Sequence, residues 1–200
     1  NGLLVQQQSG ANPFKFGMIG STDSHTSVTA SEENNFWGKF ATTEPHPGRW
    51  VKHRKPLQKD GWQYSASGLA AVWARDNNRA SIFDAMQRRE VYATTGPRIT
   101  LRLFAGWSFD SSDLTDPDIA SLGYSKGIPM GGDLTAAPAG HSLSLMMTAS
   151  KDPQSGNLDR LQVVKGWVDK DNQTFEKIYN VAWSGLRKLT AEGTLPSVGN

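Results

Sequence analysis

Residues 14–26, FKFGMIGSTDSHT, join a short apolar run to a polar cluster rich in hydroxyl, carboxylate and imidazole groups. The run at Phe14–Ile19 alternates mildly and is mostly apolar, which is typical of a strand buried in a parallel sheet or barrel. Gly20 and Ser21 mark the end of this run. Both residues are small and would let the backbone approach an ion or anion closely. The stretch therefore predicts a buried strand that runs into a polar loop.

Asp23 and His25 are the candidate metal ligands of this loop. In an extended segment residues i and i+2 point to the same side, so the two side chains are expected to project together just past the strand. One carboxylate oxygen and one imidazole nitrogen suit Zn²⁺, Mn²⁺ or Fe²⁺. The same spacing also arises by chance from a capping aspartate and a surface histidine.

Two ligands do not complete such a site, because a catalytic zinc ion typically takes about three protein ligands. The other histidines stand in loop-like contexts, without His-x-His or His-x-x-x-His spacing: His46, His53 and His141. The remaining ligands are therefore expected outside this chain, or the loop binds no metal.

The composition describes a globular, near-neutral chain of 200 residues, with 37% hydrophobic and 20% charged residues. That balance excludes a disordered chain, and no run approaches about eighteen apolar residues, so no transmembrane segment is expected. Lys+Arg 21 minus Asp+Glu 19 gives +2, which argues against nucleic acid and favours a small-molecule or ester substrate. The absence of cysteine excludes disulfides and cysteine nucleophiles; it leaves the compartment open, with a periplasmic or exported location preferred over a cytoplasmic one.

Helical and strand patterns divide the rest of the chain. Ser27–Gly61 has little periodicity and is interpreted as a long excursion with one short helix near Glu32–Phe40. A short helix is expected over Ser67–Ala74, and Asn78 is expected to cap a helix over Arg79–Arg89 whose apolar stripe faces the core. Beyond this helix the period changes to that of strands, with a hairpin loop at 168–174; the strands are expected around residues 99–104, 143–148, 161–164 and 175–183.

Several segments resemble known families. Phe16–Thr26 looks like the closing metal motif of the PHP superfamily of metal-dependent phosphoesterases. Further segments narrow the resemblance to a bacterial domain-of-unknown-function family, numbered thirty-six-oh-four and often classed with PHP-like hydrolases: NFWGK at 35–39, SASGLAAVW at 65–73, RREVYATTGPR at 88–98 and VKGW at 164–167. The resemblance extends over nearly the whole chain.

The resemblance implies an α/β plus β fold, made of the last strands and helices of a distorted PHP-type (β/α)7 barrel followed by an antiparallel β-rich region. Residues 1–98 would be the barrel part, with the metal-motif loop and the long excursion. Residues 99–200 would be the β-rich region, continuing beyond the chain end. Family members open with a His-x-His motif that this sequence does not contain. Only Asp23 and His25 carry over as ligands, and the remainder of the same polypeptide would supply the others.

The function that the resemblance implies is a metal-dependent hydrolase, a phosphoesterase by analogy, which uses metal-activated water in the full-length protein. The fragment alone would be inactive. The catalytic candidates are Glu32, as a general base near the metal motif, and Arg89 and Arg98, which with Arg88 and Tyr92 surround the turn at Thr94–Gly96 as oxyanion-binding groups. Each also has a purely structural interpretation, as a solvated helix start for Glu32 and as a tightly built turn for the two arginines.

A second interpretation belongs to a different class of protein. The β-rich half would be a non-catalytic binding or interaction module, with the metal motif vestigial. A third interpretation is a structural assembly domain exposed at the cell surface. Metal content separates the first interpretation from the others.

Overall fold

The computed structural model describes residues 2–27, 39–40, 46–51, 60, 63–64 and 68–196. Within the long excursion it describes a short 3₁₀ helix, η2 (Arg49–Val51). The helix expected near Glu32–Phe40 lies outside the described residues except for its last two positions, and Glu32 itself lies outside them.

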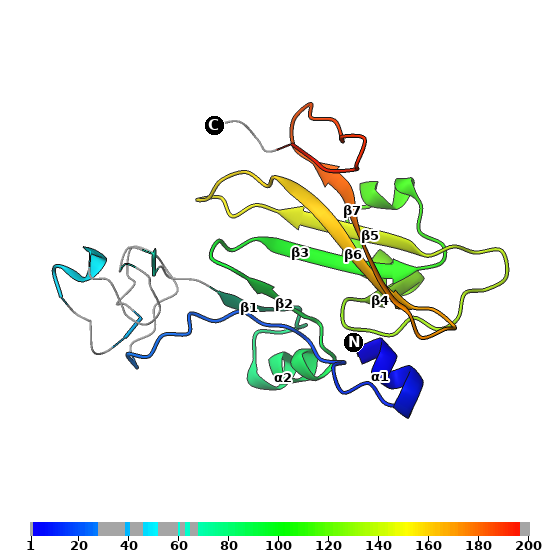
Figure 1. Ribbon diagram of the computed structural model, residues 1–200, viewed down its shortest axis with the longest axis horizontal. Helices are drawn as coiled ribbons and strands as arrows, with labels where there is room; N and C mark the ends of the chain where they lie inside the picture. The colour runs from blue at the N-terminus through cyan, green and yellow to red at the C-terminus, as the bar shows by residue number, and fades with distance from the viewer. Residues whose placement is uncertain are drawn as a thin grey trace. The chain divides into compact units, whose positions relative to one another are not determined.

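The chain divides into two compact units, one formed by Asn1–Phe16 with Ser155–Asn200 and the other by Gly17–Gln154. The expected boundary between residues 98 and 99 falls inside the second unit. The described strands of both units form antiparallel sheets of two or three strands (Figure 1). The assignment of the first half to a PHP-type barrel stays a prediction.

The first sheet of the Gly17–Gln154 unit pairs β1 (Leu69–Val72) with β2 (Val91–Thr94), and α2 (Arg79–Gln87) lies between them in the chain. The short helix expected over Ser67–Ala74 is wrong, because residues 69–72 form β1. Pairing with β2 supplies the hydrogen bonds of this segment, and such tertiary pairing outweighs the helix propensity of its alanines.

The helix α2 is the predicted one, and Asn78 caps it as expected: its Oδ1 accepts a hydrogen bond from the Ser81 amide at 2.9 Å. The predicted apolar stripe is not the buried face. Ala85 is fully buried, whereas Phe83 and Met86 are 58% and 41% exposed. The helix thus packs through its small residue and leaves the larger apolar side chains at the edge of the contact.

The second sheet of this unit has the strand order β4-β3-β5, with β3 at Thr100–Gly106, β4 at Gly127–Pro129 and β5 at Ser144–Ser150. Both neighbours of β3 run antiparallel to it. The strands predicted around 99–104 and 143–148 are confirmed. Their most buried side chains are Phe104 and Met146, which lie on the alternate positions and not among the apolar residues 99, 101, 103, 143, 145 and 147 that predicted the strands. The three-residue strand β4 was not predicted, since so short a segment has no readable period.

The core of this unit lies where β3 and β5 meet α3 (Ile119–Lys126), which follows the 3₁₀ helix η4 (Ser111–Thr115). Phe104 and Met146 are directly opposite each other in the two strands and are only 1% and 3% exposed. The helix packs through Gly123, where a Cβ atom would lie 2.4 Å from Cδ2 of the Phe104 ring. Contact between helix and ring at this position therefore requires glycine.

The other unit joins the two ends of the chain. Its sheet is the hairpin of β6 (Arg160–Val168) and β7 (Thr174–Trp183), which confirms the predicted strands and their turn. The helix α1 (Gly2–Ser9) belongs to the same unit, and its Gln7 side chain donates a hydrogen bond to the Asp169 carbonyl at 3.2 Å.

The strand predicted over Phe14–Ile19 is wrong. This segment belongs to no strand, and Phe16 and Met18 are 64% and 72% exposed. A strand needs a neighbouring strand that exchanges backbone hydrogen bonds with it along its length. Among the described residues no strand pairs with this segment, and just beyond it the Gly20 amide donates to the Leu69 carbonyl at 3.1 Å.

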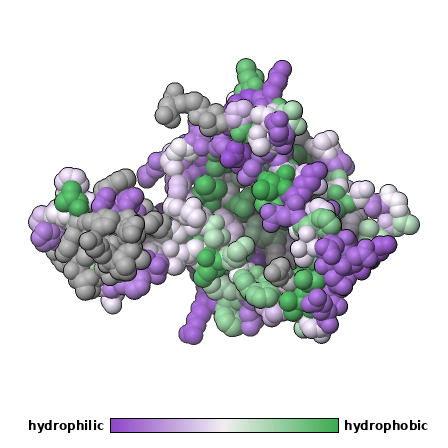
Figure 2. Space-filling view, viewed as in Figure 1, coloured by the Kyte–Doolittle hydropathy of each residue, from purple (hydrophilic) through white to green (hydrophobic). Residues whose placement is uncertain are grey.

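Apolar side chains also reach the surface elsewhere in the described residues, and Figure 2 shows them in green among hydrophilic residues on one face. None of the helices in the described ranges is long enough and apolar enough to cross a membrane.

Candidate functional site

A close contact between two backbone segments positions the metal-motif loop. Gly68 adopts φ of 77°, and a Cβ atom there would lie 2.1 Å from the Ser21 carbonyl oxygen. Gly20 is equally confined, since its Cβ would lie 2.5 Å from the Thr94 carbonyl oxygen. The chain therefore passes directly against the entrance of β1 before it emerges as the loop with Asp23 and His25, and glycine makes this approach possible.

The structure brings the Asp23 and His25 side chains together. Asp23 Oδ1 and His25 Nε2 lie 3.9 Å apart, and both side chains are more than half exposed. Lys39 joins them: its ammonium group donates to the Asp23 carboxylate and to the Asp23 backbone carbonyl, the latter at 2.6 Å. This hydrogen bond and the charge of Lys39 hold the pKa of Asp23 below its ordinary value.

His25 is oriented by its own backbone and by a neighbouring ring. Its amide donates to the Lys39 carbonyl at 2.8 Å, in an isolated parallel bridge with Phe40. The imidazole and the Phe40 ring have centroids 5.2 Å apart. These contacts leave the imidazole edge directed at Asp23 available for a ligand role.

The donor pair fits two corners of a divalent metal site. Two ligands about 2.1 Å from an ion, at angles of about 90° to 110°, lie about 3.0 to 3.5 Å apart. The observed 3.9 Å between Asp23 Oδ1 and His25 Nε2 is only slightly wider, so a small side-chain rotation suffices. Within the described ranges no group of three His, Cys, Asp or Glu side chains is placed to hold a metal.

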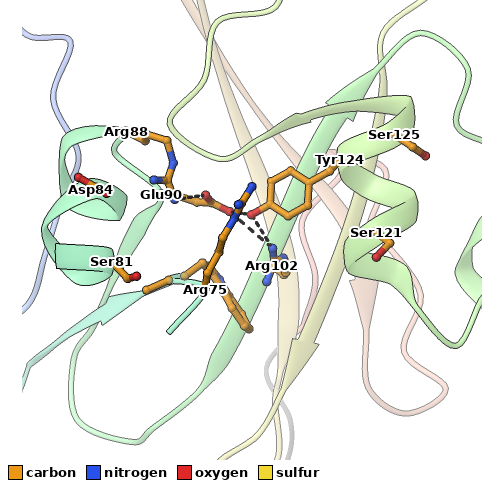
Figure 3. Close-up of a pocket in the computed structure, with 11 residues that line it drawn as sticks. Arg75, Ser81, Asp84, Arg88, Glu90, Arg102, Ser121, Tyr124 and Ser125 are labelled. Atoms are coloured by element: carbon orange, nitrogen blue, oxygen red, sulfur yellow. Dashed lines mark hydrogen bonds and ion pairs between the residues drawn. The ribbon is translucent and has the colours of Figure 1, made fainter. Parts of the chain in front are cut away.

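A second candidate site is an open cleft of about 820 Å³ in the Gly17–Gln154 unit (Figure 3). Its walls come from the segment after β1, from α2 and two residues that follow its end, from β3 and from α3. The charged and polar side chains that line it are Arg75, Ser81, Asp84, Arg88, Glu90, Arg102, Ser121, Tyr124 and Ser125.

The end of α2 places Glu90 at the centre of this cleft. Arg89 adopts the left-handed conformation with φ of 62°, its amide donates to the Met86 carbonyl, and the Glu90 amide donates to the Ala85 carbonyl, both at 3.0 Å. This pair of bonds is a Schellman motif, which reverses the chain direction after a helix. The Glu90 carbonyl then accepts from the Trp73 amide at 3.0 Å, which ties the turn to the strand pair.

The Glu90 carboxylate is 2% exposed and has partners on both oxygens. Tyr124 donates its hydroxyl hydrogen to Oε1, and Arg102 Nη2 lies 3.5 Å from the same oxygen. Arg88 Nη2 lies 3.3 Å from Oε2. Figure 3 shows the three side chains pointing toward Glu90. Burial of a carboxylate is costly unless it is paired in this way, so Glu90 organises the cleft as an ion-paired centre.

Aromatic rings hold Arg102 in place. The centre of its guanidinium lies 4.1 Å from the centroid of the Trp73 ring and 5.4 Å from that of Tyr124. Its Nη2 donates to the Tyr124 hydroxyl at 2.9 Å, and the indole of Trp73 donates to the Leu101 carbonyl at 3.0 Å. Desolvation, together with the hydrogen bond to Glu90 and its negative charge, raises the pKa of Tyr124. The hydroxyl therefore stays protonated as a donor.

The comparisons with known proteins give one match. A family model described as "Protein of unknown function (DUF3604)" matches residues 1–200. The chain belongs to the DUF3604 family. No curated protein and no solved structure matches it.

The structure of this DUF3604 chain places Arg88, one of the arginines predicted from sequence, in the cleft, and Arg89 and Arg98 outside it. Arg89 is the left-handed residue of the helix end, and its guanidinium lies 3.6 Å from the Asp133 carboxylate. Arg98 is exposed, and its amide donates to the Asp152 carboxylate at 2.8 Å. Tyr92 donates its hydroxyl hydrogen to the Ile99 carbonyl at 3.1 Å, and Glu32 lies outside the described residues.

Sequence reasoning missed the centre of the cleft. Glu90 and Arg88 lie inside the quoted family segment 88–98, but nothing in their spacing marks the carboxylate as buried. The partners Arg102 and Tyr124 follow Glu90 at separations of 12 and 34 residues, from different elements. A buried acid next to an arginine at the end of a capped helix is the one local signal that was available.

Proposed function

We propose that this DUF3604 chain contributes Asp23 and His25 as two ligands of a divalent metal ion, Zn, Mn or Fe, in a metal-dependent hydrolase that acts on a phosphate ester or another ester. The 3.9 Å separation of their donor atoms, on an exposed loop, carries the proposal. The resemblance of residues 16–26 to the PHP metal motif supports it. The remaining ligands come from outside the described residues, so the proposal concerns the full-length protein.

When bound, a divalent ion in such a site lowers the pKa of a coordinated water to about 7, which supplies a nucleophile at neutral pH. The residues of this chain prepare the two ligands. Lys39 favours the ionised Asp23 carboxylate, and the neighbouring Phe40 ring, tilted by 34° to the imidazole of His25, restricts the orientation of that imidazole. Lys39 also places a positive charge beside the ligands, where it attracts an anionic ester.

The metal content of the full-length protein tests this proposal. Protein purified without chelator is analysed by inductively coupled plasma mass spectrometry, beside the variants Asp23→Asn and His25→Gln and the control His141→Gln. His141 is exposed and its Nδ1 contacts the Trp107 carbonyl, away from the loop. We expect bound Zn, Mn or Fe to fall in both loop variants and to stay unchanged in the control.

Hydrolysis of 4-nitrophenyl phosphate and 4-nitrophenyl acetate by the same preparations distinguishes the two ester classes. Activity that falls in parallel with metal content supports the hydrolase. Metal content unaffected by both loop substitutions would exclude Asp23 and His25 as ligands.

A second candidate function, a non-catalytic binding module, is favoured by one face of the β6–β7 hairpin. Trp167 and Phe175 are directly opposite each other and stacked, with centroids 5.4 Å apart. Lys165 lies on the same face, with its ammonium 5.0 Å from the Trp167 ring, and Lys177 lies 4.9 Å from the ring of Tyr179. Aromatic rings interleaved with lysines suit an anionic polysaccharide.

Binding of the protein to heparin, measured with Trp167→Ala and with Trp50→Ala as the control for an exposed tryptophan elsewhere, tests this candidate. Weaker binding in Trp167→Ala alone supports the module. No binding of a heparin disaccharide at millimolar concentration would reject the binding module.

A further inference from the structure

We propose that the cleft around Glu90 binds a small organic anion through the guanidinium groups of Arg75, Arg88 and Arg102. The ligand class is an organic carboxylate or phosphate monoester, whose oxyanion matches the planar fork of arginine. This site is separate from the loop with Asp23 and His25 and needs no metal, so it goes beyond the proposed function.

The charges of the cleft favour an anion. Three guanidiniums line it, against the two carboxylates of Asp84 and Glu90. Glu90 is already paired on both oxygens, so its negative charge is directed at Arg88, Arg102 and Tyr124 and away from the open space. Positive charge therefore remains for a ligand.

Arginine donors remain in the cleft once Glu90 is paired. A guanidinium has five N–H donors, and the contacts of Arg88 with Glu90 use its Nη2. The Arg88 side chain is 52% exposed, so its other donors are accessible to a ligand. Arg75 is exposed, and among the residues that the structure describes it makes no ion pair. These two arginines provide the attraction, and Arg102 closes the base of the cleft.

The buried ion pairs make the cleft rigid before a ligand arrives. Arg102 is confined by the Trp73 ring on one side and by Glu90 and Tyr124 on the other. A side chain held in this way loses little conformational freedom on binding, which is the main benefit of a preorganised site. Glu90 therefore acts as a positioning residue for the arginines rather than as a ligand contact.

The size and lining of the cleft indicate the rest of the ligand. A volume of about 820 Å³ lies in the range of small-molecule sites. Trp73 and Tyr124 supply aromatic surface, and the hydroxyls of Ser81, Ser121 and Ser125 supply neutral donors around it. A ring or short carbon skeleton that carries one oxyanion uses all three kinds of group.

A purely structural ion-pair network explains only part of the arrangement. It accounts for Glu90, Arg102 and Tyr124, which satisfy one another at the edge of the core. It gives no role to Arg75, which lines the same space without an ion pair in the described part of the chain. Substitution of Arg75 therefore distinguishes a ligand site from a purely structural network.

Calorimetric titration of the full chain with benzoate, phenyl phosphate and benzyl alcohol tests the proposal, with and without EDTA. We expect saturable binding of at least one of the two anions, with Kd on the order of 1 mM, and no binding of benzyl alcohol. The comparison of benzoate with phenyl phosphate identifies which oxyanion the cleft prefers. Binding should survive EDTA, because no metal takes part.

Three variants with the same change in charge locate the site: Arg75→Gln, Arg88→Gln and the control Arg79→Gln. Arg79 is exposed on α2 and does not line the cleft. We expect Kd to rise roughly tenfold in Arg75→Gln and Arg88→Gln and to stay unchanged in the control. Circular dichroism melting curves establish that each variant is folded, and Arg75→Gln removes no ion pair found among the described residues.

Three outcomes would overturn the proposal. The first is no saturable binding of either anion up to about 20 mM. The second is an equal loss of affinity in all three variants, which would indicate general electrostatic attraction. The third is binding that EDTA abolishes and that the arginine substitutions leave intact, because that binding belongs to the metal site of the proposed function.

Discussion

The loop with Asp23 and His25 and the cleft around Glu90 hold their charged groups in opposite ways. In the loop the carboxylate and imidazole are more than half exposed, and backbone contacts at Gly20 and Gly68 place them. In the cleft the carboxylate of Glu90 is buried, and side chains from the end of α2, from β3 and from α3 hold it.

This difference separates two ways of building a functional site. An exposed pair of ligands remains available for an ion, but it supplies too few donors to complete a site by itself. A buried, fully paired carboxylate binds nothing further, yet it fixes the arginines around it. We therefore expect substitutions in the cleft to change folding stability, and substitutions in the loop to change metal binding with little effect on stability.

Removal of the Glu90 charge should give the largest effect. Glu90→Gln leaves Arg88 and Arg102 close together without their counter-charge, and breaking a buried pair costs about 3 to 5 kcal/mol. Urea denaturation measures the loss in the free energy of unfolding. Asp23→Asn, in the exposed loop, is the control and should lower the unfolding midpoint far less than Glu90→Gln does. A cost below about 1 kcal/mol for Glu90→Gln would contradict the contrast between the two sites.

A methyl group at Gly68 tests how the loop is supported. In Gly68→Ala the added Cβ meets the Ser21 backbone, so we expect a loss of about 1 to 3 kcal/mol from overpacking. Gly140→Ala is a matched control, because Gly140 has a similar φ of 79° and no atom within 4 Å of its Cβ position. Equal losses in the two variants would show that backbone conformation, and not the close contact, limits the position.

Hydrogen exchange at the His25 amide reports the local effect of Gly68→Ala on the loop. This amide is bonded to the Lys39 carbonyl, so displacement of the segment after Gly68 should accelerate its exchange in Gly68→Ala. Unchanged exchange would mean that the loop is placed independently of β1.

Substitutions of Arg89 should have a smaller effect on stability, and here glycine should be more favourable than alanine. Its φ of 62° suits glycine, so Arg89→Gly should be more stable than Arg89→Ala by about 1 kcal/mol in thermal denaturation. Both variants lose the exposed contact with Asp133, so their difference isolates the backbone. An alanine variant as stable as the glycine variant would argue against the helix end described above.

Acid and alkali should weaken the two regions separately, with the smallest effects. The pKa of Asp23 is lowered, so its contact with Lys39 stabilises the fold above the ordinary aspartate pKa of about 3.9 and is lost as the pH falls through the lowered value. The pKa of Tyr124 is raised, so its contribution is present below about pH 10 and is lost as the pH rises through the raised value.

Urea midpoints measured from about pH 2 to about pH 11 test both signs. Asp23→Asn should lack part of the acid loss, and Tyr124→Phe part of the alkaline loss. If the urea midpoints of both variants changed with pH in the same way as those of the original chain do, neither Asp23 nor Tyr124 would contribute to the pH dependence of stability.

Local sequence pattern predicted those elements whose stability is local. The Asn78 cap and the strand β5 are visible within a few residues, and both are confirmed. The burial of β5 does not follow the predicted alternation, because Met146 is its one buried residue. The strand β1 was mistaken for a helix because its pairing with β2 involves residues 19 to 25 positions away. Phe14–Ile19 has the composition of a buried strand, but composition does not supply a neighbouring strand to pair with it.

The same limit applies to the candidate sites. The side chains of Asp23 and His25 lie close together as expected, but Asp23 adopts φ of 51° and not the extended conformation on which the i, i+2 argument rests. Their role as ligands stays a prediction. The cleft gave no comparable signal, because Trp73, Glu90 and Tyr124 meet only through the packing of separate elements. Arg89 and Arg98 were selected as charged neighbours of a turn, and the structure directs both elsewhere.

The division of the chain has a consequence for the order of events during synthesis. The unit formed by residues 17–154 is continuous, so all of its parts are present before the hairpin of β6 and β7 has been made. The helix α1 is made before the Gly17–Gln154 unit, yet its own unit is complete only when that hairpin appears. Because domains fold as units while the chain grows, α1 must wait for the β6–β7 hairpin until the Gly17–Gln154 unit has been synthesised. A pause in translation just after residue 154 would therefore leave α1 without its hairpin, whereas every residue of the Glu90 cleft would already have been made.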